Sequence, residues 1–331
     1  MKAMGRLGAA ALLCWLGGSG LAAGGRPGEE PPVTALAFAP DGKELVAGSQ
    51  AGIEIRAWPD LGVLRRIETS LAHVHDIAFS PDGRWMAVAG GRPAESGGVE
   101  LRAWPSGELL WTKAARDDLV YSVAWSPDSQ SLYCAGHDAR VFVRAAESGA
   151  TVRVLEGHSR PVLAACVTPD GAMVVTAGVD QSLRAWDAST GECLRVLDNH
   201  TGTVRDLAMR PDADPDALAI VASVSDDGTV RLWQPTIGRL VRFARLPAAP
   251  LAVEWTPDGA RLLVTAKNGR LYAIDPDTLE VASAPTAIAG WVYSLAVPPG
   301  GHAGDHGVAV AGENGQIGAL RVPIPTGEDT R

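Results

Sequence analysis

VHDIAFSPDG, residues Val74 to Gly83, decides the fold, because variants of it occur seven times along the chain. In each copy, large apolar residues alternate with small ones, as a β-strand requires, and a turn follows. Proline fixes φ in that turn, and glycine tolerates the left-handed position that closes a hairpin. The turn prolines recur at intervals of 41 to 46 residues, at Pro40, Pro81, Pro127, Pro169, Pro211, Pro257 and Pro299.

Each interval has room for three further short strands. A second strand follows the turn, as in Met86 to Gly90. A third ends in tryptophan in four units, and a fourth, more polar strand such as Val63 to Ile67 completes the unit. Four short strands repeated at this period are typical of propeller blades. We therefore predict an all-β fold: one seven-bladed β-propeller of four-stranded antiparallel blades over residues 33–322, with no second domain.

Closure of the ring leaves two alternatives open. The last unit ends after its third strand, since Pro323 and Pro325 follow at once. Residues 26–32, which could supply a fourth strand, contain three prolines, and proline cannot donate to a sheet ladder. Either the last blade is three-stranded, or a poor extended segment covers it.

The N-terminus is a different kind of sequence. Lys2 and Arg6 precede an apolar run from Leu7 to Leu16, and small residues follow. This pattern predicts a signal peptide over residues 1–24, a short linker at 25–32 and a C-terminal tail at 323–331. The apolar run is too short to span a bilayer, so we expect no membrane span. The predicted location is outside the cytoplasm, either periplasmic or secreted.

Composition narrows the class further. The net charge is −9 and no basic block occurs, which disfavours nucleic acid as a partner. Removing the signal peptide leaves three cysteines, Cys134, Cys166 and Cys193, and an odd number leaves at least one thiol without an intrachain partner. We expect buried free cysteines.

Two units carry a further signature. In one, Gly157-His158 is followed by Thr176, Asp180 and Trp186-Asp187; the next has its equivalents within the run SVSDDGTVRLW. These units resemble the tryptophan–aspartate (WD) repeat family, and the resemblance covers about residues 33–322. It implies two structural tetrads, each a buried hydrogen-bond chain: His158, Thr176, Asp180 and Trp186, and His200, Ser223, Asp227 and Trp233.

The other five units depart from that pattern. Arg144, Ile274 and Leu320 stand where tryptophan is expected in units 3, 6 and 7. Gly52 and Gly98 replace the aspartate in units 1 and 2. We expect these units to rely more on packing.

Candidate partner contacts follow from ring geometry. The second residue of every innermost strand should lie at one mouth of the central channel, and adjacent loops add further side chains. Tyrosine, arginine and histidine are frequent anchors of protein interfaces, although an ordinary polar rim has the same composition. The predicted partner-binding residues are His75, Tyr121, Arg205, Tyr293, Thr34, Asp226, Lys267 and Glu313, and Leu163, Leu251 and His137 belong to the same ring of positions.

No catalytic motif stands out, and we predict no cofactor or metal. His302 and His306 could clamp a metal, but they lie in a glycine-rich loop that does not fix their spacing. Glu254 takes a strand position that usually holds alanine, and we expect a cationic or solvent partner for it. The resemblance implies a non-enzymatic exported scaffold for a protein or peptide ligand. The alternative is an exported propeller enzyme, lactonase-like or quinoprotein-like, that uses the central channel.

Overall fold

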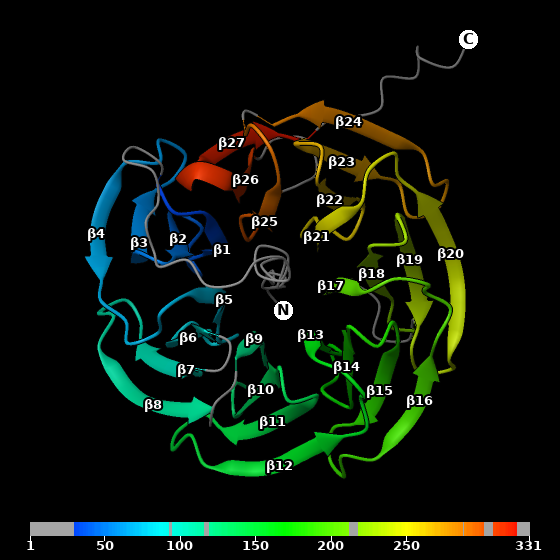
Figure 1. Ribbon diagram of the computed structural model, residues 1–331, viewed down its shortest axis with the longest axis horizontal. Coiled ribbons are helices and arrows are strands. Elements are labelled where there is room, and N and C mark those ends of the chain that lie inside the picture. Colours follow the sequence, from blue (N-terminus) through cyan, green and yellow to red (C-terminus); the bar gives the residue numbers. More distant parts are fainter. Residues whose placement is uncertain are drawn as a thin grey trace.

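The chain forms a ring of seven antiparallel sheets around a central axis (Figure 1). The computed structural model describes residues 30–92, 95–115, 119–211, 218–286, 288–300 and 307–322. Six sheets have four strands each, and the seventh, β25-β26-β27, has three within the described residues. The predicted seven-bladed propeller is confirmed, and of the two alternatives for the last blade the three-stranded one is observed.

The strands run outward from the axis in chain order in every blade. The innermost strands are β1 (Val33–Phe38), β5 (Val74–Phe79), β9 (Val120–Trp125), β13 (Val162–Val167), β17 (Val204–Met209), β21 (Pro250–Trp255) and β25 (Val292–Ala296). The second strands are β2 (Glu44–Ser49), β6 (Trp85–Arg92), β10 (Ser131–Gly136), β14 (Met173–Gly178), β18 (Val221–Ser225), β22 (Leu262–Ala266) and β26 (Gly307–Gly312).

The outer half of each blade is more exposed than the inner half. The third strands are β3 (Gly52–Ala57), β7 (Ser96–Ala103), β11 (Arg140–Ala145), β15 (Leu183–Asp187), β19 (Thr229–Gln234), β23 (Arg270–Ile274) and β27 (Ile317–Arg321). The outermost strands are β4 (Val63–Ile67), β8 (Leu109–Ala115), β12 (Thr151–Glu156), β16 (Cys193–Leu197), β20 (Arg239–Arg245) and β24 (Val281–Pro285). Among the described residues the only helical element is a 3-10 turn at Glu313–Gly315.

Every innermost strand carries a bulge at its second residue. In blade 2, for example, Val74 pairs with Gly90 and Asp76 with Ala89, so that His75 has no residue opposite it. Opposite the bulge, the backbone at Gly90 packs closely against the backbone at His73: a Cβ on Gly90 would lie 1.9 Å from the carbonyl oxygen of His73. A bulge re-aims the side chain of its extra residue. The predicted contacts on the innermost strands, such as His75 and Tyr121, therefore stand on bulges.

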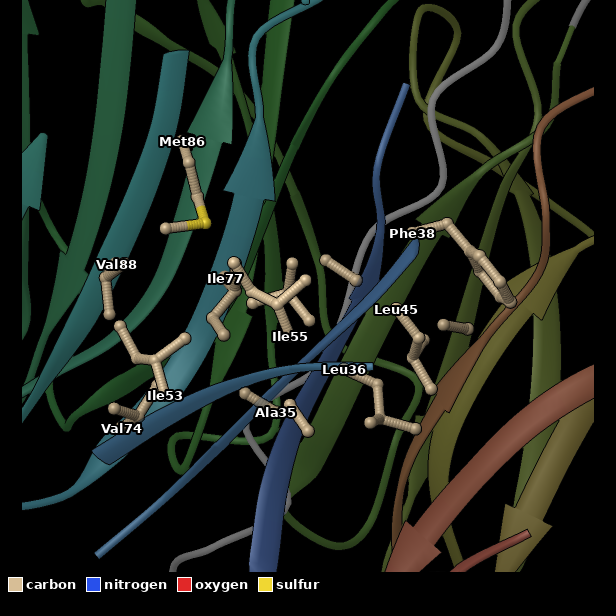
Figure 2. Packing of buried hydrophobic residues seen from close by; sticks show 14 of the residues in the cluster. Ala35, Leu36, Phe38, Leu45, Ile53, Ile55, Val74, Ile77, Met86 and Val88 are labelled. Carbon is tan, nitrogen blue, oxygen red and sulfur yellow. The ribbon is translucent and has the colours of Figure 1, made fainter. Parts of the chain in front are cut away.

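The core lies between neighbouring blades. In the cluster shown in Figure 2, Ile53 and Ile55 of β3 lie beside Val74 and Ile77 of β5, and all four are buried. Alanines such as Ala35 line the same interface and leave room for these larger side chains. Radial sheets are thus buried on both faces, which explains why most residues of the inner strands are apolar.

Polar ties join the blades near the axis. The buried carboxylate of Asp76 accepts hydrogen bonds from Ile77 N (2.8 Å) and, in the next blade, from Val123 N (2.9 Å). Asp206 does the same between blades 5 and 6. Between blades 7 and 1, Leu36 N donates to Ser294 Oγ (3.1 Å). These contacts satisfy buried backbone donors across the blade interfaces.

A second set of ties lies at the perimeter. Trp111 of β8 donates from Nε1 to Ala146 O in the turn of the next blade (2.8 Å). Arg153 of β12 donates to Ala188 O of blade 4 (2.8 Å), and Arg65 of β4 donates to Ser106 O of blade 2 (3.3 Å). In blades 1 to 3, the third residue of the outer strand thus fastens its blade to the neighbour.

Several predictions fall wholly or partly outside the described residues. These are the signal peptide at 1–24, most of the linker at 25–32, the tail at 323–331 and the pair His302 and His306. The domain boundaries therefore remain predictions. Cys134, Cys166 and Cys193 are free; the first two are buried and the third is half-buried. The described residues include no helix with the length and hydropathy of a membrane span.

Candidate functional site

The predicted partner contacts gather at the end of the ring where the inner strands begin, which we call the rim. They form two chains of contacting side chains. The first arc joins blades 2 and 3 and consists of Arg92, His73, His75, Tyr121 and His137. The second arc joins blades 5 to 7 and consists of Arg205, Asp226, Lys267, Trp291, Tyr293 and Glu313.

In the first arc, aromatic rings follow one another from blade to blade. His73 and His75 stack with their ring centroids 6.2 Å apart, and the ring of Tyr121 lies 5.7 Å from that of His75. Tyr121 Oη lies 2.9 Å from Nδ1 of the exposed His137. Arg92 Nε is 3.0 Å from His73 Nε2. The arc therefore ends in one cation and one exposed imidazole.

Burial and charge keep the stacked histidines neutral. Burial, reinforced by the neighbouring His73, lowers the pKa of His75 to about 4. Burial and the charge of Arg92 also lower the pKa of His73. Desolvation disfavours the charged imidazolium, so both rings are uncharged at neutral pH. The first arc thus combines two uncharged histidine rings with the cation of Arg92.

The second arc alternates charge and aromatic surface. Arg205 Nε donates to Asp226 Oδ2 (3.0 Å), and Lys267 Nζ reaches Oδ1 of the same carboxylate (3.3 Å). The Lys267 ammonium also lies over the Trp291 ring, 4.8 Å from its centroid. Tyr293 then links Trp291 to Glu313, its hydroxyl donating to Oε1 (3.4 Å). Lys267 and Trp291 are partly exposed, so this pair is open to a ligand.

Burial corrects the expectation that the bulged residues themselves form the contact surface. Exposure is only 8% for His75, 1% for Tyr121, 3% for Arg205 and 3% for Tyr293. Thr34 is half-buried, and its hydroxyl donates to Val74 O of the next blade. Leu163 and Leu251 are fully buried. The bulged side chains instead support more exposed neighbours, of which His73, Arg92 and Trp291 were missed from the sequence.

Two buried atoms of the rim lack hydrogen-bond partners within the described residues. They are Nδ1 of His75 and Nη1 of Arg205. Leaving such atoms unpaired is costly, and natural proteins do so rarely. Their position on the bulges of blades 2 and 5 places one in each arc.

The tetrad residues lie in hydrogen-bonded chains in blades 4 and 5. In blade 4, His158 Nδ1 is 2.9 Å from Asp180 Oδ2, and Nε2 is 2.8 Å from Thr176 Oγ1, to which Trp186 Nε1 also donates. In blade 5 the equivalent distances from His200 are 2.8 Å to the carboxylate and 2.7 Å to the hydroxyl. The side chains of both histidines are buried.

Electrostatics supports the same assignment. Burial alone would raise the pKa of Asp227, but hydrogen bonds from Thr229 and His200 outweigh it and hold the pKa at about 2. In blade 4, burial is likewise outweighed by hydrogen bonds from His158 and its neighbours, which lower the pKa of Asp180. A permanently ionised, fully engaged carboxylate is poorly suited to proton transfer. These chains stabilise the blades.

Blades 1 and 2 contain a different polar clamp, which the sequence reasoning missed. In blade 2, the buried Glu100 pairs with Arg102 (2.7 Å) and accepts from Ser70 N (2.8 Å). In blade 1, Arg56 Nε donates to Glu54 (3.1 Å). The expectation that these blades rely on packing is therefore wrong. The signal was present as Glu-x-Arg-Ala-Trp in both units, two residues beyond the glycine that replaces the tetrad aspartate.

Histidine, cysteine, aspartate and glutamate side chains do not gather in groups of three that could hold a metal ion, within residues 30–322 as described. Glu254 is buried in β21. Burial raises the pKa of the Cys134 thiol to about 12, so this sulfur is inert as a nucleophile.

Comparison with protein families gives the identity of the repeat. The model of the WD domain, G-beta repeat (WD40), matches five segments: residues 26–53, 64–92, 107–143, 149–187 and 191–234. Together they make up more than half of the chain. The chain belongs to the WD40 repeat family. The matched segments end in blade 5, and the WD40 blades that follow have Ile274 and Leu320 in place of the repeat's tryptophan.

Among curated proteins, the chain is similar to two kinds of WD40 relative. It is 33% identical over 131 residues to eukaryotic translation initiation factor 3 subunit I of Neurospora crassa, which covers 34% of this chain and 37% of that protein. The same subunit of Pyricularia oryzae is 32% identical over 28% of this chain and 32% of its own length. Ribosome biogenesis protein ERB1 of Phaeosphaeria nodorum is 40% identical over 86 residues, 24% of this chain and 11% of that protein. The matches thus span about a third or less of these relatives.

These relatives correct the predicted location. Translation initiation and ribosome biogenesis take place inside the cell, and the initiation factor is named as eukaryotic. The prediction of an exported protein of bacterial type, periplasmic or secreted, is therefore wrong. The N-terminal pattern of charge followed by an apolar run resembles a signal peptide by composition alone, and the relatives give it no support.

Proposed function

We propose that this protein is a non-enzymatic scaffold that binds a protein or peptide segment at the rim. The observation that carries the proposal is the partly exposed Lys267–Trp291 pair, set in a continuous arc of charged and aromatic side chains. Tryptophan at the centre of an interface is a typical energetic anchor, and a cation over its ring adds specificity. A partner that presents an acidic and an apolar side chain together would fit this pair.

Family membership and relatives support the same reading. WD40 propellers generally serve as platforms for other proteins. Two of the similar proteins are named as subunits of a multi-subunit initiation factor, and a role within an assembly is what the proposal assigns to this chain. The rim acids are engaged with other side chains, Asp226 with Arg205 and Lys267, and Glu313 with Tyr293. Acids held in such contacts suit the binding of a partner better than proton transfer, so we favour a binding role over an enzymatic one.

The test uses peptides selected from a displayed random library against the immobilised full chain. A selected peptide is titrated against Lys267→Glu/Trp291→Ala and against a matched control, Arg84→Glu/Trp85→Ala. The control removes a similar cation–aromatic pair, 4.6 Å from charge to ring centroid, at the opposite end of the ring. Loss of a tryptophan anchor is worth about 2 kcal/mol or more, so we expect at least about 30-fold weaker binding in the rim variant only. Equal affinities in both variants would refute the rim as the binding surface.

A further inference from the structure

Blade 7 presents an edge that is covered in every other blade. The third strands of six blades pair on both sides, whereas β27 pairs only with β26 among the described residues. Figure 1 shows β27 at the outer side of its blade, between the blades that end in β24 and β4. Ile317 and Leu320 of β27 are half-buried against the neighbouring cores. An unpaired edge with an apolar lining is a template for an added strand.

The other blades show what chemistry fits this position. In the first four, the third residue of the outer strand is Arg65, Trp111, Arg153 or Arg195, and an exposed leucine or valine precedes it in each. Three of these side chains donate to backbone carbonyls in the turn of the next blade. Arg195 packs against Gly238 in the corresponding turn of blade 5. The position therefore favours leucine or valine followed by arginine or tryptophan.

The acceptor for such an arginine is present beside blade 7. The next blade in the ring is blade 1, and its turn carries Pro59 and Asp60 where blade 2 has the carbonyls of Pro105 and Ser106. Both Pro59 and Asp60 are exposed. The Asp60 carboxylate places a negative charge at the position of Ser106 in blade 2, which suits an arginine here.

The flanking sequence of the chain itself does not match this chemistry. Arg65, Trp111, Arg153 and Arg195 each precede the first residue of the next inner strand by nine positions. Nine positions before Val33 stands Gly24, within the run AAGGR. Glycine and alanine are poor strand formers, and the run has neither arginine nor tryptophan at the anchoring position.

We infer that the edge of blade 7, unpaired among the described residues, binds an extended segment of another protein as the fourth strand of that blade, with leucine or valine followed by arginine. Backbone hydrogen bonds to β27 supply affinity, and the arginine reaches the blade 1 turn at Asp60. This surface lies on the perimeter of the ring, so the inference stands independently of the rim.

The experiment uses the full chain and a peptide copied from blade 3, residues 149–157 (GATVRVLEG), with blocked ends. Binding is measured by titration, and its position by hydrogen exchange with and without peptide. We expect saturable binding with slowed exchange in residues 317–321. A peptide with the Arg153→Ala change should bind about 2- to 10-fold more weakly, and one with Val154→Pro should not bind.

A protein variant tests the anchor without touching the fold. Asp60→Asn, at an exposed turn position, should weaken the parent peptide but leave the Arg153→Ala peptide unchanged, because the two changes remove the same contact. Protection of an outer strand such as β20 instead of β27 would overturn the inference. So would slow exchange of residues 317–321 before peptide is added, since the edge would then already be covered by the chain itself.

Discussion

Asp76→Ala should be among the most damaging single substitutions in this protein. The carboxylate is 1% exposed and accepts from two buried backbone donors, Ile77 N at 2.8 Å and Val123 N at 2.9 Å. Alanine would leave both N–H groups without an acceptor. Each unsatisfied group costs about 1–3 kcal/mol, so the free energy of unfolding should fall by about 2–6 kcal/mol. That is a large share of the 5–15 kcal/mol typical of a folded protein.

The assay is equilibrium unfolding in urea followed by tryptophan fluorescence. Asp206→Ala should lose a similar amount, because Asp206 makes the same pair of contacts to Leu207 N (2.7 Å) and Val253 N (2.8 Å). Ser294→Ala, which removes one acceptor at 3.1 Å from Leu36 N, should lose about half as much. A free energy of unfolding for Asp76→Ala within about 0.5 kcal/mol of wild type, the range of an ordinary surface substitution, would refute this role of Asp76.

Four further outcomes are expected. His200→Ala should lower stability by about 1–3 kcal/mol for each group it leaves unpaired, and an unchanged melting temperature would contradict the tetrad in blade 5. The pKa of His75 is about 4 in the folded protein and 6.5 in the unfolded chain, so the unfolded chain binds more protons between these two pH values. The free energy of unfolding should therefore fall by up to about 3 kcal/mol as the pH drops from 6.5 to 4. His75→Gln should remove this part of the pH dependence of stability. Glu100→Gln should lower the free energy of unfolding by about 3–5 kcal/mol, because it breaks a buried ion pair. Glu54→Gln breaks a partly exposed pair and should lower it by less than half as much. Equal losses in the two variants would contradict the view that burial makes the Glu100 pair the more important one. Without a ligand, amides of Ile317–Arg321 should exchange faster than those of Leu183–Asp187, and slower exchange would show that the blade 7 edge is covered.

The blade count followed from sequence because turn chemistry is local. Each Pro-Asp-Gly-type turn fixes its own hairpin, and seven turns at a near-constant spacing predict seven blades. The residues of the two tetrads were named from the resemblance to the WD repeat, which pairs His158 with Thr176 and His200 with Ser223. The Glu100–Arg102 clamp is equally local, and it was missed because aspartate was sought at Gly98 and glutamate two residues later was not.

Other features depend on pairing and could not be predicted in this way. A bulge is a property of two strands in register, so the burial of Tyr121 and Arg205 followed only from the structure. Asp76 finds its second donor on the next blade, 47 residues along the chain. Location was inferred from N-terminal composition, and composition does not distinguish a signal peptide from another apolar, alanine-rich start.

The blade interfaces are unequal, and this inequality bears on where a ligand can bind. Blades 2 and 3 are joined by Asp76 and by Trp125, whose Nε1 donates to Ala78 O (3.1 Å). Blades 5 and 6 repeat both contacts through Asp206 and Trp255. In each case the bulged rim residue directly precedes the aspartate, so the two arcs of the rim stand on these two doubly tied interfaces. Side chains held by such interfaces lose little conformational freedom on binding, which lowers the entropic cost of association. The edge of β27 lies instead in blade 7, which the hydroxyl of Ser294 ties to blade 1. A rim partner would therefore meet a preorganised surface, whereas an added strand at β27 would extend blade 7 at the perimeter of the ring.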